Sequence, residues 1–533
     1  MRVVVPKDRP ESIDAIDWGL VFCLSMLGAS IFAICNAGRI DIIDGQWRFE
    51  VAYNLVKYGL PEVVDPAIRA WAIPGRNGAM YSGYGISGSL LALPFVGLAE
   101  WFHPGYRDLA QFSFSFVSPL FGGVLLGALY LAYRWLCVKR IQALFWVLVF
   151  GFTSLVFPLS TSAFDQIQHA LFLLITVGCA YQAGISGSVL LAGAGIGSFA
   201  ILAGYQIAYF IVWPSLLWLV GLRKLSDFPG KTREPGPVRT YWLGGWLTFM
   251  LIIAFNVYRF GVPWIPAGQG GHPPVFGNLI SGFLLLLISP GKGILWYSPP
   301  VIFCLAGWSR FRRKYLEFSW GVLLVASSWL LLIATLSFPG GDWSWGPRYW
   351  VPVLPLLFLA APFLCCATPL SKFIALCVLL SSLMVQILSI SVDHQRFFFE
   401  RNLQPFFWYK NAEFYYHDSA LASRVVELKS IHSRQNLASY RAFRPGPYPE
   451  MYTYAFFGPK QNDRLDISGW LDGYAVFWLP RPWPLWSLSI DDESIQMGRT
   501  NIVTKLIILG AIGLSGIVML IFRARRTTNP YSS

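Results

Sequence analysis

Two carboxylates directly after the first long apolar run are the residues best placed to do chemistry. Asp41 and Asp44 lie in the stretch IDIID, a few residues from the expected membrane surface. A carboxylate held at a membrane boundary could act as a general base for the hydroxyl group of an acceptor. A structural interpretation is also open, in which Asp44 caps the helix that follows and Arg48 is its exposed partner.

The segment that follows IDIID has the periodicity of an amphipathic helix. Trp47, Val51, Leu55 and Tyr58 recur at helical spacing along one stripe, and the polar residues between them mostly face the other way. Such a helix is predicted to lie in the membrane interface rather than to cross the membrane. It would hold the preceding carboxylates at the lipid boundary.

A further carboxylate is paired with a histidine at helical spacing. Asp165 and His169 lie four residues apart in FDQIQHALFLL, so they share one face of a helix at the outer end of a span. The pair could position an acceptor or supply two ligands to a metal, although two ligands are weak evidence for a metal site. A capping aspartate and a hydrogen-bonded histidine would give the same pattern.

Two basic residues stand in short loops with unusual composition. Lys292 lies in SPGKGILWYSPP, where a turn rich in glycine and proline could expose backbone N–H groups to an anion. Arg348 lies in FPGGDWSWGPRY, and arginine binds phosphate in a bidentate way. The structural alternatives are a snorkelling lysine and an aromatic belt with an Asp342–Arg348 pair. Together the two cations could hold a phosphate and stabilise it as a leaving group.

The composition is that of a polytopic membrane protein. The chain has 533 residues, of which 55% are hydrophobic and 13% are charged, and the mean hydropathy is +0.51. The net charge of +13 is spread over many short segments, which argues against a nucleic-acid partner. The eight cysteines lie in or beside apolar runs, so neither a disulfide framework nor a cysteine metal motif is expected. The first apolar run is too long for a cleavable signal peptide.

Twelve membrane-spanning helices are predicted, near residues 17–37, 110–136, 141–159, 166–183, 188–204, 206–222, 240–258, 293–308, 317–337, 349–366, 373–391 and 502–522. The basic loops between them should be cytoplasmic, provided that segments 85–102 and 276–290 lie on the outer face without crossing. Both termini are then cytoplasmic. The candidate site residues all face the periplasm or cell exterior from a plasma (inner) membrane.

Three regions follow from this topology. Residues 1–391 form an all-α transmembrane domain with interfacial helices and site-bearing loops on its outer face. Residues 392–500 are expected to form a small outer domain of α/β or mixed type, whose many aromatic residues suit sugar rings or a bilayer surface. Residues 501–533 carry the last span and a basic cytoplasmic tail.

The order of these segments resembles the GT-C superfamily of membrane glycosyltransferases that use polyprenyl-phosphate sugars. The similarity is to the bacterial protein-mannosyltransferase and lipid A aminoarabinose-transferase group, and it covers most of residues 17–391. An acidic outer loop is followed by YSGYGISGSLLALPF as a non-spanning helix, and then by FDQIQHALFLL, SPGKGILWYSPP and WSWGPRYWVPVLPLL. The chain also departs from these families: DIID replaces the paired acidic motif of protein mannosyltransferases, and the WWDYG signature of oligosaccharyltransferases is absent.

The resemblance implies roles for the candidate residues. Asp44, with Asp41 second, would act as the base or orient the acceptor, and Lys292 and Arg348 would hold the donor phosphate. The acceptor-binding or supporting residues would be Asp165, His169, Asp342 and Arg48.

The implied reaction moves a hexosyl or pentosyl group from a polyprenyl-phosphate donor to a lipid, glycan or protein acceptor by an inverting single displacement. Donor, acceptor and membrane lipids are then the partners; no cofactor is required, and a divalent metal is an open alternative. A transporter is a competing hypothesis, but the expected spans carry little charge at their centres and no internal repeat is evident. A non-catalytic envelope-assembly protein that handles lipid-linked sugars is another.

Overall fold

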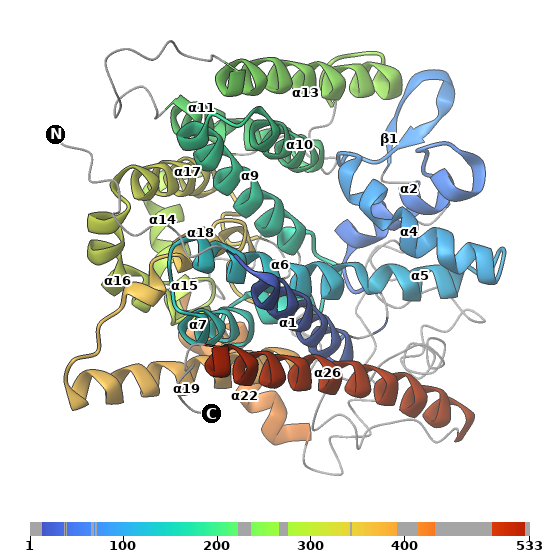
Figure 1. Cartoon of the computed structure of the whole chain (residues 1–533). Coiled ribbons are helices and arrows are strands. Elements are labelled where there is room, and N and C mark those ends of the chain that lie inside the picture. Colours follow the sequence, from blue (N-terminus) through green and yellow to red (C-terminus); the bar gives the residue numbers. More distant parts are fainter. Residues whose placement is uncertain are drawn as a thin grey trace.

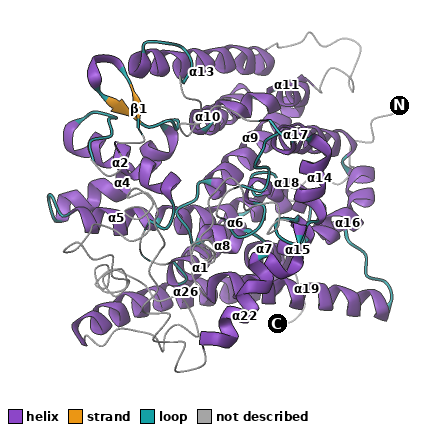
Figure 2. Cartoon of the chain, turned by 180° about the vertical axis from the view of Figure 1, so that it is seen from behind, coloured by secondary structure: helices purple, strands orange, loops and turns teal. Residues whose placement is uncertain are grey.

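The computed structural model describes residues 13–36, 38, 40–65, 69, 72–221, 236–265, 276–341, 344–391, 414–431 and 493–527. Within these residues the chain is almost entirely helical, with a single short two-stranded ribbon (Figures 1 and 2). This agrees with the predicted all-α class.

The α-helices are α1 (Ala15–Ile34), α2 (Ile43–Tyr58), α4 (Ser87–Phe102), α5 (Arg107–Ser115), α6 (Val117–Trp135), α7 (Arg140–Thr153), α8 (Val156–Ser160), α9 (Gln166–Ser186), α10 (Val189–Tyr205), α11 (Trp213–Gly221), α13 (Gly236–Phe260), α14 (Leu279–Ile288), α15 (Ile294–Tyr297), α16 (Val301–Lys314), α17 (Leu316–Ala334), α18 (Leu354–Phe358), α19 (Pro369–Ser391), α22 (Ala420–Ile431) and α26 (Glu493–Thr527). The 3₁₀ turns are η1 (Arg76–Gly78), η2 (Ile207–Val212), η4 (Arg348–Trp350), η5 (Ala361–Phe363) and η6 (Tyr416–Asp418). Strands β1 (Ile73–Pro74) and β2 (Met80–Tyr81) pair antiparallel.

Seven described helices are long and apolar enough to cross a membrane: α1, the α5–α6 run, α9, α13, α17, α19 and α26. Several other expected spans are interrupted. Residues 293–308 divide into α15 and α16 around Pro299 and Pro300, because proline donates no backbone hydrogen bond. The number of twelve spans therefore stays a prediction.

The two segments expected not to cross the membrane are short helices. α14 has 10 residues, about 15 Å of helix, which is half the thickness of a bilayer core of roughly 30 Å. α4 packs against α2 and α5, and the three helices lie together at one side of the molecule in both views.

The first helix lies between α6 and α26. Gly123 of α6 sits so close to α1 that a side-chain carbon would come 2.2 Å from the carbonyl oxygen of Ser25. Small residues at such crossings let membrane helices approach closely. On the other side Gly19 faces Leu520, whereas Gly510 faces Ser30, so α26 runs antiparallel to α1. The start of α1 and the end of α26 therefore lie at the same end of the molecule.

Charged side chains fix that end of the helix bundle. Asp17 accepts hydrogen bonds from Arg134 Nε at 2.9 Å, from Arg140 Nε at 3.0 Å and from the hydroxyl of Tyr130 at 2.7 Å. The two arginines belong to a loop that the sequence analysis expected on the same face as the N-terminus. Their contacts with Asp17 place this loop and the start of α1 at the same end of the helix bundle.

The C-terminal helix is longer than predicted. α26 begins at Glu493, inside the segment assigned to the outer domain, and continues to Thr527. Of residues 392–492, only 414–431 are described, and they hold η6 and α22. The rest of the predicted outer domain lies outside the described residues.

Most of the polar side of the amphipathic helix α2 is buried. Arg48 is 5% exposed, Glu50 0% and Asn54 3%, whereas Lys57 near the end of the helix is exposed. These groups are buried because neighbouring elements supply partners; Glu50 forms an ion pair with Arg107, which also binds Asp65 at 2.7 Å. The helix is therefore packed on both sides as far as Asn54, and its last turn is exposed.

Candidate functional site

Asp44 is the centre of a hydrogen-bonded cluster formed by three separate parts of the chain. Its Oδ1 accepts a hydrogen bond of 2.6 Å from the hydroxyl of Tyr84, which lies just before α4. Its Oδ2 accepts one of 3.0 Å from Nη1 of Arg348. Asp44 lies in the first turn of α2, but the N-cap residue is Ile42 and no side chain caps the helix. The capping interpretation of Asp44 is therefore wrong.

Arg348 is held by its own loop. The residue begins η4 after a tight turn in which Gly341 has φ +74°, and a side chain on Gly341 would come 2.6 Å from Cγ of Arg348. The guanidinium carbon lies 4.5 Å from the ring centre of Phe164. The glycine leaves room for the arginine to reach Asp44, 304 residues away in sequence.

A second arginine lies beside the first. Arg48, one helical turn after Asp44, forms an ion pair with Asp165, and its guanidinium carbon lies 4.7 Å from the ring centre of Tyr84. Asp165 in turn lies 3.3 Å from Nε2 of His169. The expected exposure of Arg48 is wrong, because Asp165 pairs with it inside the protein.

The charges of this cluster shape its protonation. Burial alone would raise the pKa of the Asp165 carboxyl, but Arg48 and His169 outweigh it and hold that pKa far below its usual range. Burial would likewise lower the pKa of Arg48, yet Asp165 and Asp44 raise it. Burial and the neighbouring Asp44 hold the pKa of the Tyr84 phenol well above its ordinary value. At neutral pH Asp165 is therefore anionic, Arg48 is cationic, and Tyr84 keeps the proton that it donates.

Asp41 has a different environment. Its Oδ1 accepts a hydrogen bond of 2.8 Å from the backbone N–H of Ala163, and the side chain is 1% exposed. Asp41 thus fixes the turn before α9, which carries Asp165. This buried contact gives Asp41 a structural role in the segment that leads to Asp165.

Lys292 does not snorkel. It is 5% exposed, and its Nζ donates to the carbonyl oxygens of Gly341, Ser344 and Gly346 at 2.9, 2.7 and 3.2 Å. Its ammonium group therefore braces the loop that leads to Arg348. Asp342, the other candidate of that loop, lies outside the described residues.

Three of the sequence candidates are thus joined to Asp44 in one network: Arg348 directly, and Arg48 and Asp165 through the ring of Tyr84. Sequence reasoning missed Tyr84, although the flanking glycines of YSGYGIS mark it as part of a shaped turn. It also missed Arg259 near the end of α13. Nη1 of Arg259 donates to the carbonyl oxygens of Ser82 and Tyr84 at 2.7 and 3.0 Å.

The residues around Asp44 match an anion better than a cation. Two guanidinium groups flank the carboxylate, and they would repel a divalent metal. Within the part of the chain that the structure describes, no three His, Cys, Asp or Glu residues form a group that could hold a metal ion.

No protein-family model matches the chain, and no curated protein matches it. Among solved structures, ArnT from Cupriavidus metallidurans bound to undecaprenyl phosphate aligns at 15% identity with a TM-score of 0.46, over 83% of this chain and 75% of that one. The oligosaccharyltransferase of Archaeoglobus fulgidus in complex with zinc and sulfate aligns at 12% identity with a TM-score of 0.43, over 70% and 53%. The chain spans about half the length of this archaeal enzyme.

Both solved proteins are of the superfamily that the sequence resembles. Because their identities are low and their TM-scores stay below 0.5, we infer the function of this chain from its site residues.

Proposed function

We propose that the protein is a membrane glycosyltransferase that moves a sugar from a polyprenyl-phosphate donor to a hydroxyl group of an extracytoplasmic acceptor. The observation that carries the proposal is the partly buried ion pair between Asp44 and Arg348, with Arg48 beside it. A carboxylate next to two guanidinium groups at a membrane edge is what a phosphate leaving group and a hydroxyl nucleophile need together.

Arg348 and Arg48 hold the donor phosphate in this proposal. Arginine binds phosphate through parallel N–H groups. The Nε and Nη1 atoms of Arg48 are buried and, among the described residues, meet no hydrogen-bond acceptor. Buried donors of this kind favour an anionic ligand, because leaving them unpaired is costly. Lys292 acts indirectly, by bracing the loop of Arg348.

The reaction is a single displacement. Asp44 takes the proton of the acceptor hydroxyl as its oxygen attacks the anomeric carbon. The bond between that carbon and the phosphate oxygen breaks, and the polyprenyl phosphate leaves with the electron pair. Arg348 and Arg48 stabilise the charge that develops on the phosphate, and the configuration at the anomeric carbon inverts.

Donor binding also prepares the base. Each oxygen of Asp44 accepts one hydrogen bond and can accept a second, so a hydroxyl can bind there. The ion pair with Arg348 must weaken before Asp44 can take a proton readily. A phosphate draws Arg348 toward itself, which frees Oδ2, whereas Tyr84 continues to hold Oδ1. The negative charge of Asp44 is thereby balanced by Arg348 until the donor is in place.

The test uses purified full-length protein with a panel of polyprenyl-phosphate sugars labelled in the sugar. We expect transfer from one donor with inversion, and a fall in rate of about 10²- to 10⁴-fold for Asp44→Asn. The matched control is Asp14→Asn, the same chemical change at the other end of the molecule, where Asp14 pairs with Arg140 at 2.6 Å. Equal rates for Asp44→Asn and the wild type would contradict the assigned base.

A further inference from the structure

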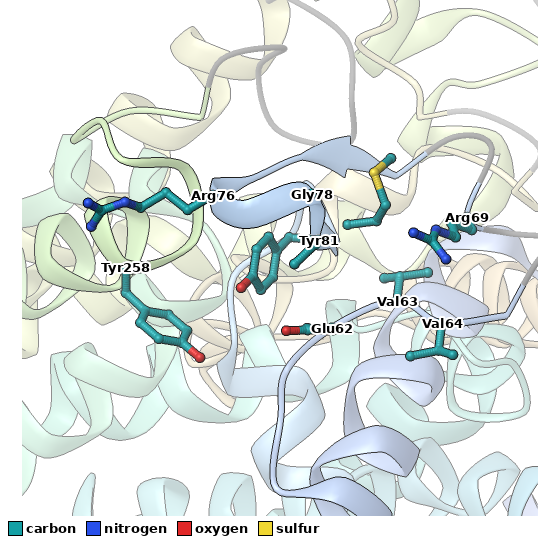
Figure 3. A pocket seen from close by; sticks show the side chains of 10 residues that line it. Glu62, Val63, Val64, Arg69, Arg76, Gly78, Tyr81 and Tyr258 are labelled. Atoms are coloured by element: carbon teal, nitrogen blue, oxygen red, sulfur yellow. The ribbon is translucent and has the colours of Figure 1, made fainter.

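A polar pocket lies beside the cluster, between the loop that follows α2 and the end of α13. Its volume is about 540 Å³, within the range of roughly 300–1,000 Å³ that is usual for small-molecule sites. Its charged and phenolic lining residues are Glu62, Arg69, Arg76, Tyr81 and Tyr258. Figure 3 shows the two arginines at opposite ends, with Tyr81 between them. We call this cavity the loop pocket.

The lining suits a particular class of ligand. The two arginines outweigh the one glutamate, and arginine forms paired hydrogen bonds with carboxylates and phosphates. Tyr258, which is half exposed, offers a flat ring with a polar hydroxyl group, a combination that matches the face and hydroxyls of a sugar. Glu62 can accept hydrogen bonds from sugar hydroxyl groups. An acidic saccharide would therefore find a partner for each of its groups.

One wall of the pocket is tightly packed and another is accessible. Tyr81 is 4% exposed and makes edge-to-face contacts with Tyr258 and Phe260, with ring centres 6.3 and 5.9 Å apart. The ribbon of β1 and β2 fixes the other side through the pairing of Ile73 with Tyr81. Tyr258 is half exposed, so a ligand can reach its ring from outside.

The loop pocket and the Asp44 cluster are built from the same two segments. Tyr81 lines the pocket, and three residues later Tyr84 donates to Asp44. Tyr258 lines the pocket, and the next residue, Arg259, holds the carbonyl oxygen of Tyr84. A molecule seated in the pocket would thus lie along the segment that leads to the proposed base.

We infer that the loop pocket binds the acidic end of a saccharide acceptor through Arg76 and Tyr258. That the saccharide is the acceptor rests on the proposed function, whereas the binding of an acidic sugar to the pocket does not. The acid can be a sugar carboxylate or a sugar phosphate, and the experiment separates the two.

The experiment measures binding without turnover. Full-length protein in detergent micelles is titrated with galacturonic acid, with glucose 6-phosphate and with uncharged galactose, by saturation-transfer NMR and calorimetry. We expect at least one acid to bind about tenfold or more tightly than galactose, because charged hydrogen bonds add to the affinity. Arg76→Ala should remove the preference for the acid over galactose. Tyr258→Ala should weaken the binding of both charged and uncharged sugars.

The controls separate local from global effects. Arg310→Ala changes another exposed arginine, on α16, and should leave binding unchanged. Asp44→Asn should also bind the acid normally, because Asp44 does not line the pocket. Wild-type protein that binds an acid but transfers no sugar from any donor would count against the proposed function alone. Failure of both acids to bind, equal affinity for galactose, or full binding by folded Arg76→Ala protein would overturn the inference.

Discussion

Asp44 divides its two carboxylate oxygens between a phenol and a guanidinium, and neither partner is near it in sequence. A surface aspartate at a helix start needs no such partners. Arg48 and Asp165 repeat the arrangement one turn further along α2, in a setting that is almost fully buried. Burying charges costs free energy unless each is paired. The cluster therefore contains two guanidinium groups that a phosphate can recruit: Arg48, which is paired with Asp165, and Arg348, which is paired with Asp44.

The Arg48–Asp165 pair should show strong coupling. Removing either partner leaves a buried charge uncompensated, so Arg48→Met and Asp165→Asn should each lower the free energy of unfolding by about 3–5 kcal/mol. The double variant should lose much less than the sum of the two single losses. The free energy of unfolding of the wild type, the two single variants and the double variant can be measured in mixed micelles. Additive losses of stability would contradict the pairing.

The same pair predicts the acid sensitivity of the fold. The pKa of Asp165 is lower in the folded protein than its unfolded value of about 3.9. Its contribution to stability is therefore complete above about pH 4 and falls as the pH drops through the folded pKa. Wild-type protein should lose more stability than Asp165→Asn between pH 5 and pH 3, as thermal unfolding can show. Parallel losses in the two proteins would argue against this assignment.

At the scale of elements, the turn between β2 and α4 links the loop pocket, α13 and the proposed base. Arg259 crosses from α13 to hold two carbonyl oxygens of that turn, and its Nη2 donates to Asn256 at 2.8 Å. Its guanidinium carbon also lies 4.2 Å from the ring centre of Phe255. Arg259 touches no proposed substrate group, so we regard it as a positioning residue for Tyr84.

Arg259→Met should misplace Tyr84 and so disturb the hydrogen bond to Asp44. We expect kcat to fall by between about tenfold and a hundredfold with little change in the donor KM, because small errors in position slow catalysis strongly. Steady-state kinetics on purified protein separates the two constants. A rise in donor KM at constant kcat would instead place Arg259 in donor binding.

At the scale of the whole molecule, composition and hydropathy were enough to predict a helical membrane protein, and the segments 85–102 and 276–290 are short helices as expected. The sequence could not reveal that Asp165 pairs with Arg48 beside the first acidic loop, because the two residues are 117 positions apart. Arg259 was overlooked since a lone basic residue at the end of an apolar run is usually an interfacial anchor. Lys292 was predicted to bind phosphate, yet carbonyl oxygens of a distant loop occupy its ammonium group. Membrane sidedness stays a prediction.

The central proposal is that Asp44 serves a sugar transfer on the outer face of the membrane. The most direct measurement is mass spectrometry of envelope glycans from cells that lack the protein and from cells that re-express the wild type, Asp44→Asn or Asp14→Asn at equal abundance. We predict that one sugar modification disappears without the protein and returns with the wild type and Asp14→Asn only. Its full return with Asp44→Asn would contradict the proposal.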